Sequence, residues 1–108
     1  MKIVDYTTAG GKNLILEYID GLTQKEQAEA YRIRLEIMRR GPIALINLDT
    51  RQLKGKLWEI KFYQNRIMYV LFDSERIYFL HACKKQKNKV ERQELGKALR
   101  RAKEYGLI

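Results

Sequence analysis

The sequence predicts an α+β domain in which a helical hairpin packs on one face of a small antiparallel β-sheet, followed by a C-terminal helix. Two segments in the first half of the chain have an apolar period of about 3.6 residues, as amphipathic helices require. Three apolar runs with very short connectors follow, and such connectors allow only antiparallel hairpins between neighbouring strands. The predicted order is βααβββα, in a single domain covering residues 1–108.

The N-terminal segment predicts a strand and a short helix. Residues 2–6 (KIVDY) alternate polar and apolar side chains, which is typical of a strand, and Gly10-Gly11 interrupts this pattern. Helical spacing then begins, and its apolar positions are Leu14, Ile15, Tyr18, Ile19 and Leu22.

A second helix is delimited by its end signals. Thr23 and Glu26 are spaced as a capping box, in which each side chain can bond the backbone amide of the other. Gly41-Pro42 is a common helix stop. We expect the buried stripe of this helix to consist of Ala28, Tyr31, Leu35 and Met38.

Three strands follow a segment of mixed pattern. The sequences LWEIKFY, RIMYVLF and RIYFLHAC predict strands over residues 57–63, 66–72 and 76–83. The second and third are mostly apolar, so we expect much of both faces of the sheet to be covered. The residues before them, 43–56, are interpreted as a loop anchored by a few apolar side chains.

A final helix completes the predicted fold. Its inner stripe comprises Leu95, Ala98, Leu99, Ala102 and Tyr105. Its basic residues are expected to lie mainly toward solvent, and they are Lys97, Arg100, Arg101 and Lys103.

The charge of the chain favours a polyanionic partner. There are 22 Lys and Arg against 13 Asp and Glu, a formal net charge of +9. Residues 84–103 alone hold nine basic and two acidic side chains. Basic stripes of this kind bind nucleic acids by neutralising phosphates and releasing counterions. An acidic protein partner or an ordinary soluble surface is the alternative.

Composition argues against several other classes of protein. No apolar run approaches the roughly 20 residues of a membrane span, and the N-terminus has no apolar signal-peptide core. Cys83 has no second cysteine to pair with, which favours the reducing cytoplasm. One cysteine and one histidine are too few for a structural zinc site, so we expect neither a metal nor a cofactor.

Two residues are candidates for proton transfer and phosphate binding. His81 has an ordinary pKa of about 6.5 and could transfer a proton near neutral pH. Arg66 opens the second of the three strands, and a guanidinium group binds phosphate through two parallel contacts. Each has a simpler interpretation, as a hydrogen-bonded strand histidine and an ordinary strand-end arginine.

Lysines flank these candidates along the chain. Lys54 and Lys56 surround Gly55, which allows a tight turn or a close approach to a ligand. A second group follows the third strand and consists of Lys84, Lys85, Lys87 and Lys89. Solvated loops are the simpler interpretation of both groups. The predicted sheet nevertheless places the second group near His81 and Arg66.

Two nuclease mechanisms fit parts of this pattern. Glu59 and Lys61, with Asp49 upstream, have the spacing of magnesium-dependent nucleases, but so short a pattern arises often by chance and the fold order differs. A metal-free mechanism uses the 2′-hydroxyl of RNA as nucleophile, with basic side chains on the phosphate and histidine moving protons. DNA lacks this hydroxyl, so such a site would select RNA.

Four segments of the sequence resemble the phage-derived, HigB-like toxins of the RelE/ParE superfamily. They are LKGKLWEIKF, NRIMYVLF, IYFLHACKKQKNK and ELGKALRRAKEY. The resemblance implies the toxin of a type II toxin–antitoxin system, an endoribonuclease that cleaves mRNA at the ribosome and inhibits translation. It also implies a helix-turn-helix antitoxin as partner and a fold like the one predicted.

The resemblance further implies which residues form the site. The expected catalytic residues are Arg66, His81, Lys85 and Lys54, and the expected RNA-binding residues are Lys56, Lys84, Lys87 and Lys89. Arg66 and Lys85 would contact the scissile phosphate, with His81 as general acid. The chain departs from the family at Ala82-Cys83, where Gly-Phe is frequent, and at Lys89-Val90-Glu91, where Thr-Pro is frequent. An inactive binding module and a ParE-like gyrase inhibitor are the alternative functions.

Overall fold

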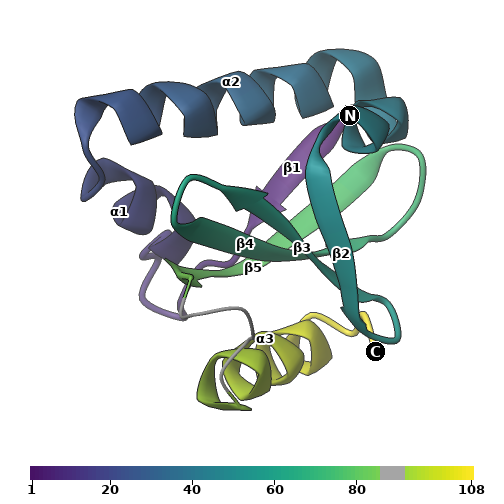
Figure 1. Cartoon of the computed structure of the whole chain (residues 1–108). Helices are drawn as coiled ribbons and strands as arrows, with labels where there is room; N and C mark the ends of the chain where they lie inside the picture. The colour runs from purple at the N-terminus through teal and green to yellow at the C-terminus, as the bar shows by residue number, and fades with distance from the viewer. Residues whose placement is uncertain (86–91) are drawn as a thin grey trace.

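The computed structural model describes residues 1–85 and 92–108, and it has a five-stranded sheet between two helical layers (Figure 1). Helices α1 and α2 cover one face of the sheet and α3 covers the other. The elements in chain order are β1 (Lys2–Asp5), α1 (Leu14–Asp20), α2 (Gln24–Arg40), the 3₁₀-helix η1 (Gly41–Asn47), β2 (Asp49–Lys54), β3 (Leu57–Phe62), β4 (Asn65–Leu71), β5 (Arg76–Lys84) and α3 (Arg92–Glu104). The predicted α+β class is confirmed.

The strand order β1-β5-β4-β3-β2 confirms the antiparallel meander of β3, β4 and β5 and corrects two other expectations. Residues 43–56 are not a loop, because they form most of η1 and the edge strand β2, which pairs with β3. β1 runs parallel to β5, so the sheet is mixed. An edge strand has one side open to solvent and can be polar. The sequence of β2, DTRQLK, is polar, so it lacks the apolar run by which β3, β4 and β5 were predicted.

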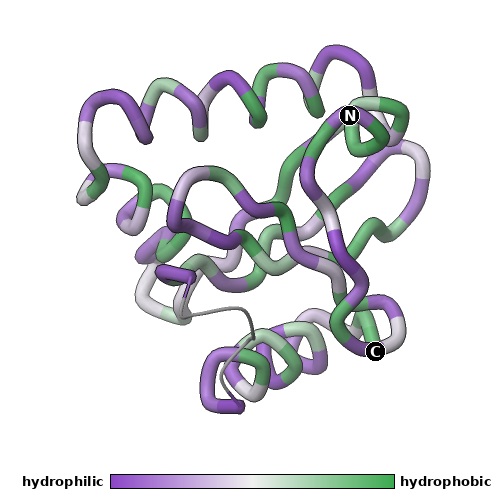
Figure 2. The backbone as a smooth tube through the Cα atoms, in the orientation of Figure 1, coloured by the Kyte–Doolittle hydropathy of each residue, from purple (hydrophilic) through white to green (hydrophobic). Residues whose placement is uncertain are grey.

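The predicted buried stripe of α2 is wrong. The helix begins with the predicted capping box, but its buried residues are Ala30, Ile33 and Ile37. Tyr31, Leu35 and Met38 have exposed fractions of 42–45%, on the side away from the sheet. Two apolar stripes run along this helix, where hydrophobic and hydrophilic residues alternate (Figure 2). Both have helical spacing, so periodicity alone could not tell which one faces the sheet.

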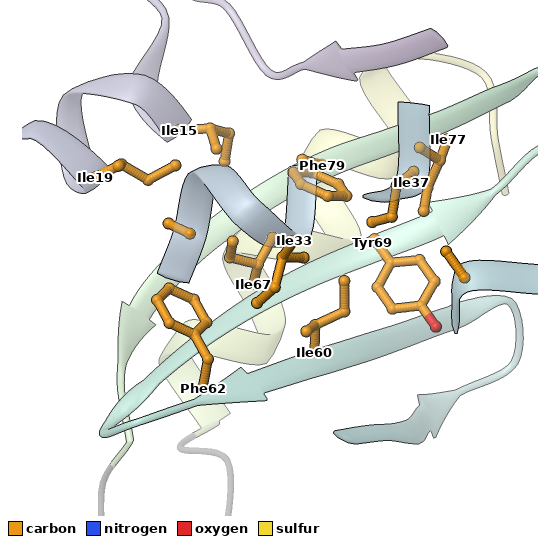
Figure 3. Close-up of a cluster of buried hydrophobic side chains, with 12 residues drawn as sticks. Ile15, Ile19, Ile33, Ile37, Ile60, Phe62, Ile67, Tyr69, Ile77 and Phe79 are labelled. Carbon is orange, nitrogen blue, oxygen red and sulfur yellow. The ribbon is translucent and has the colours of Figure 1, made fainter. Parts of the chain in front are cut away.

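The larger core fills the space between the sheet and the α1–α2 pair (Figure 3). It consists mainly of branched aliphatic and aromatic side chains, and its large members are Ile15, Ile19, Ile33, Ile37, Ile60, Phe62, Ile67, Tyr69, Ile77 and Phe79. Each large side chain removed from water contributes about 1.5–3 kcal/mol relative to an exposed position. This layer therefore holds the helical pair on the sheet.

The smaller core lies under α3 and confirms its predicted inner stripe. Ala98 and Ala102 are fully buried, and Leu95, Leu99 and Tyr105 pack around them. The sheet contributes Leu57, Met68, Val70 and Leu80. The two small alanines let α3 approach the strands closely. The part of the sheet face that contacts these alanines is apolar.

A glycine ends α3 in a Schellman motif. Gly106 has φ +71, the amide of Leu107 donates to the carbonyl of Ala102 at 2.9 Å, and the amide of Gly106 donates to Lys103 at 3.0 Å. Leu107 is thereby turned back into the smaller core, where it is 5% exposed.

No helix within residues 1–85 and 92–108 combines the length and apolar character needed to cross a membrane.

Replacing Gly106 by Ala should lower the free energy of unfolding by about 1–2 kcal/mol, because a Cβ disfavours positive φ. The matched control is Gly96→Ala, within the exposed part of the same helix, where a Cβ would meet nothing within 4 Å. That change should raise the free energy of unfolding by about 0.5–1 kcal/mol. Urea unfolding measures both, and equal signs for the two variants would contradict the assignment.

Candidate active site

A buried ionic cluster joins three neighbouring strands on the α3 face of the sheet. Glu59 of β3 is 0% exposed and lies between two arginines. Its Oε1 accepts from the guanidinium Nη1 of Arg66 in β4 at 3.2 Å, and its Oε2 is 3.0 Å from Nη2 of Arg51 in β2. We call Arg51, Glu59 and Arg66 the arginine–glutamate cluster. It carries two positive charges and one negative charge.

The cluster uses few of the donors that its arginines offer. Within residues 1–85 and 92–108, the buried Nε atoms of Arg51 and Arg66 have no hydrogen-bond partner, and Glu59 Oε2 accepts no hydrogen bond. The contact between Arg51 and Glu59 is thus an ion pair without aligned hydrogen-bond geometry. Buried polar groups are normally satisfied, so these open donors distinguish the cluster.

A second cluster holds the histidine between β5 and α3. His81 is 7% exposed, and its Nε2 is 2.5 Å from Glu94 Oε2. Nη1 of Arg101 lies 3.0 Å from His81 Nδ1 and also donates to the carbonyl of Leu80 at 3.0 Å. A guanidinium can only donate, so Nδ1 accepts and the imidazole proton resides on Nε2. We call His81, Glu94 and Arg101 the histidine cluster.

Burial sets the protonation state of the imidazole. The pKa of His81 is lowered mainly by desolvation, and the charges of Arg101 and Lys97 lower it further, whereas Glu94 acts in the opposite direction. At neutral pH the ring is therefore neutral, with one defined tautomer. This arrangement corrects the expectation that Arg101 lies mainly toward solvent.

Cys83 connects the two clusters. It lies opposite Arg66 in the β4–β5 pairing and two residues from His81, on the same face of β5. Burial is the main cause that raises the pKa of its thiol to about 11, with the charge of Glu94 adding to the shift. The thiol is therefore protonated at neutral pH and unreactive.

The potential metal ligands in this region do not favour a cation. Atoms of His81, Cys83 and Glu94 that could bind a metal lie within 4.8 Å of one another. The thiol is protonated, and the guanidinium of Arg101 already occupies the same imidazole. The magnesium pattern finds no support either, since Glu59 is paired with two arginines and Asp49 lies 4.0 Å from Lys61.

Only part of the predicted lysine set lies near Arg66 and His81. Lys85 follows β5 directly and donates its backbone amide to Gln64 at 2.6 Å. The side chain of Lys84 points to the α1–α2 face, where its Nζ donates to Asn65 at 3.0 Å. Strand alternation explains this, because Lys84 is one residue from Cys83. Lys87 and Lys89 lie outside the described residues.

Lys54 and Lys56 lie away from Arg66. Lys54 ends β2 and lies opposite Leu57 of β3. Across the next strands, Leu57 pairs with Val70 and Val70 pairs with Tyr78, so these residues form one row across the sheet. Arg66 and Cys83 belong to a row at the other end of the strands, next to Lys85. The structure therefore places Arg66 and His81 on one face of the sheet, with Lys85 directly after the same end of β5, and it leaves the β2–β3 turn apart.

Of two hollows on the surface of the described residues, one adjoins this site. A cavity of about 420 Å³ opens between α1, the end of β5 and α3, and its lining includes Tyr18, His81, Lys84 and Arg101. A larger apolar hollow of about 520 Å³ lies near η1 and the β2–β3 turn, away from both clusters. The smaller one is the more relevant, because it reaches the imidazole.

Residues 17–103 match the family model of phage-derived Gp49-like proteins, a stretch that starts within α1 and ends within α3. The chain belongs to the Gp49-like family. This family is related to RelE- and HigB-like toxins, so membership indicates a toxin-like function of the toxin–antitoxin type and an antitoxin partner. Assignment to the HigB branch stays a prediction. A comparison with curated proteins finds no match.

Three residues of this Gp49-like site were missed by sequence reasoning. They are Arg51, Glu94 and Arg101, each on an element other than the strands that hold Arg66 and His81. Arg51 lay in a segment interpreted as a loop. Glu94 and Arg101 are seven residues apart, which places them on one side of α3 two turns apart, and this spacing could have suggested that they share a partner.

The chain has a single histidine, so its titration can be followed by NMR without overlap from another imidazole. Glu94→Gln removes the charge that raises the pKa of His81, and the pKa should fall further. Arg101→Gln removes a charge that lowers it, and the pKa should rise. Glu36→Gln on the opposite helical layer serves as control and should leave it unchanged. Shifts of the same sign for the two site variants would refute the arrangement of the histidine cluster.

Proposed function

We propose that this Gp49-like protein is the toxin of a type II toxin–antitoxin system. It acts as a metal-independent endoribonuclease that cleaves mRNA at the ribosome and so inhibits translation, and its antitoxin is a helix-turn-helix protein. One observation carries the proposal: Arg66 and an oriented, neutral His81 share one face of the sheet, with Cys83 between them. These are the two kinds of group that phosphate activation and proton transfer require.

The proposed reaction uses the nucleophile that RNA supplies. In the neutral imidazole, only Nδ1 of His81 has a lone pair that can accept a proton. We propose that the side chain of Arg101 moves away from Nδ1 and that Nδ1 then takes the proton of the 2′-hydroxyl. The 2′-oxygen bonds to phosphorus as the bond to the 5′-oxygen breaks, which leaves a 2′,3′-cyclic phosphate. Arg66 stabilises the charge on the phosphoryl oxygens, and Glu94 stabilises the imidazolium.

The structure modifies the roles that we expected from the sequence. A general acid must be protonated, and burial lowers the pKa of His81, which favours the base role instead. Lys85 is then our candidate for donating a proton to the departing 5′-oxygen, since it lies at the same end of β5 as Arg66. Lys54 and Lys56 can contact only more distant parts of an RNA chain.

A non-catalytic binding module is the rival function, and one observation favours it. Arg66 is 1% exposed and is already paired with Glu59, so RNA reaches its guanidinium only after neighbouring side chains move. In that case the basic surface would bind RNA or an acidic segment of the antitoxin without cleavage.

Induced synthesis of the protein should arrest growth and produce new mRNA ends, and the purified protein should cleave RNA equally well with EDTA. Arg66→Lys with His81→Asn should lower the cleavage rate by at least about 100-fold, because phosphate activation and proton transfer are both impaired. These substitutions keep similar side-chain volumes, and circular dichroism checks that the variant folds. Arg76→Lys, at the opposite end of β5, is the matched control. Undiminished cleavage by the folded double variant would exclude this site, and absence of any cleavage by the parent would favour the binding module.

A further inference from the structure

The arginine–glutamate cluster has one more positive charge than negative charge. Its two guanidinium groups face one carboxylate, and within residues 1–85 and 92–108 no second carboxylate pairs with either arginine. Glu59 and Arg66 are buried and Arg51 is partly exposed, so the unbalanced positive charge lies at the surface end of the cluster, where an anion can pair with it. The surplus of one charge matches a single phosphodiester.

Other arginines of the chain show what a completed pair looks like. Arg34 donates to both oxygens of Asp5 at 2.8 and 2.9 Å, and Arg32 donates to both oxygens of Glu29 at 2.7 and 2.9 Å. Each of those guanidinium groups has a carboxylate to itself. Arg51 and Arg66 instead share Glu59, each touching it through one nitrogen. Their Nε donors stay open, and that of Arg66 belongs to a side chain only 2% exposed.

Access to the cluster runs through Arg51. Its side chain is 42% exposed, whereas those of Glu59 and Arg66 are 0% and 2% exposed. Arg51 belongs to β2, the last strand in the sheet order. An approaching phosphate therefore meets Arg51 first, and its loosely aligned contact with Glu59 leaves the guanidinium able to rotate.

We propose that Arg51 and Arg66, held side by side by Glu59, form a two-arginine site for one backbone phosphate of RNA, in which Arg51 makes the first contact. Glu59 is a positioning residue, since it orients both guanidinium groups without touching the RNA. This inference rests on the proposed function, because it takes RNA as the ligand. It adds a binding residue on β2 that lies on the same face as Arg66.

Binding is tested separately from cleavage with a fluorescent single-stranded RNA whose 2′-hydroxyls are all methylated, so that it cannot be cut. Arg51→Gln should weaken binding about tenfold, as expected for one lost charge-assisted contact. It should also reduce the slope of log Kd against log salt concentration by about 0.7, which is the contribution of one neutralised phosphate in a single strand. Fluorescence anisotropy over a series of salt concentrations measures both quantities.

Arg32→Gln is the matched control, because it changes the net charge equally and removes an arginine paired with one carboxylate on the opposite helical layer. Its affinity should stay within about twofold of the parent. Arg51→Lys keeps the positive charge but cannot bind a phosphate through two parallel N–H groups. Its salt dependence should equal that of the parent, and its affinity should lie between those of the parent and Arg51→Gln. Thermal unfolding identifies any variant whose loss of binding reflects loss of folding.

The possible results separate this inference from the proposed function. If the parent cleaves unmodified RNA but Arg51→Gln binds the methylated RNA as Arg32→Gln does, the two-arginine site is wrong and the endoribonuclease stands. If Arg51→Gln loses affinity while the parent cuts no RNA, the phosphate site is supported and the catalytic proposal fails. If the folded parent binds no RNA at all, both are overturned.

Discussion

The buried carboxylate of Glu59 is the constraint around which the α3 face of the sheet is organised. A carboxylate with no exposed surface must have cationic partners, and here it takes them from the strands on either side. Arg66 is consequently buried, and the partly exposed Arg51 of the edge strand is paired with the same carboxylate. The sheet face is thereby divided into an ionic half and an apolar half, and the buried alanines of α3 pack on the apolar half.

The histidine cluster extends this polar region to the helix. Glu94 and Arg101 bond opposite nitrogens of one imidazole, so the position of α3 over β5 is coupled to the protonation state of His81. A proton added at Nδ1 would face the guanidinium of Arg101, and the two cations would repel each other. In this fold, proton transfer at His81 is therefore linked to movement of Arg101, a side chain that also anchors the helix to the carbonyl of Leu80.

Local patterns were sufficient for much of this fold but not for contacts between distant elements. The meander, the capping box and the inner stripe of α3 follow from periodicity and turn length, and all three are present. The face of α2 was decided by which of two apolar stripes fits the sheet, which is a tertiary property. His81 was singled out by its residue type, and Arg66 by its place at the start of a strand and by the family resemblance, while Arg51 and Arg101 matter only because the fold brings them there. The orientation of Lys84 could have been predicted, because adjacent strand residues point to opposite faces.

The parallel pairing of β1 with β5 has a consequence for how the chain folds. Lys2 lies opposite Arg76, and Asp5 lies opposite Phe79. The first strand therefore pairs with a strand that is more than 70 residues away in the sequence. Contacts between residues so far apart in sequence form slowly, because a long loop must close first. The local hairpins of β3, β4 and β5 can assemble earlier. During synthesis, β1 therefore stays unpaired until β5 has left the ribosome, and the five-stranded sheet is completed only after that point.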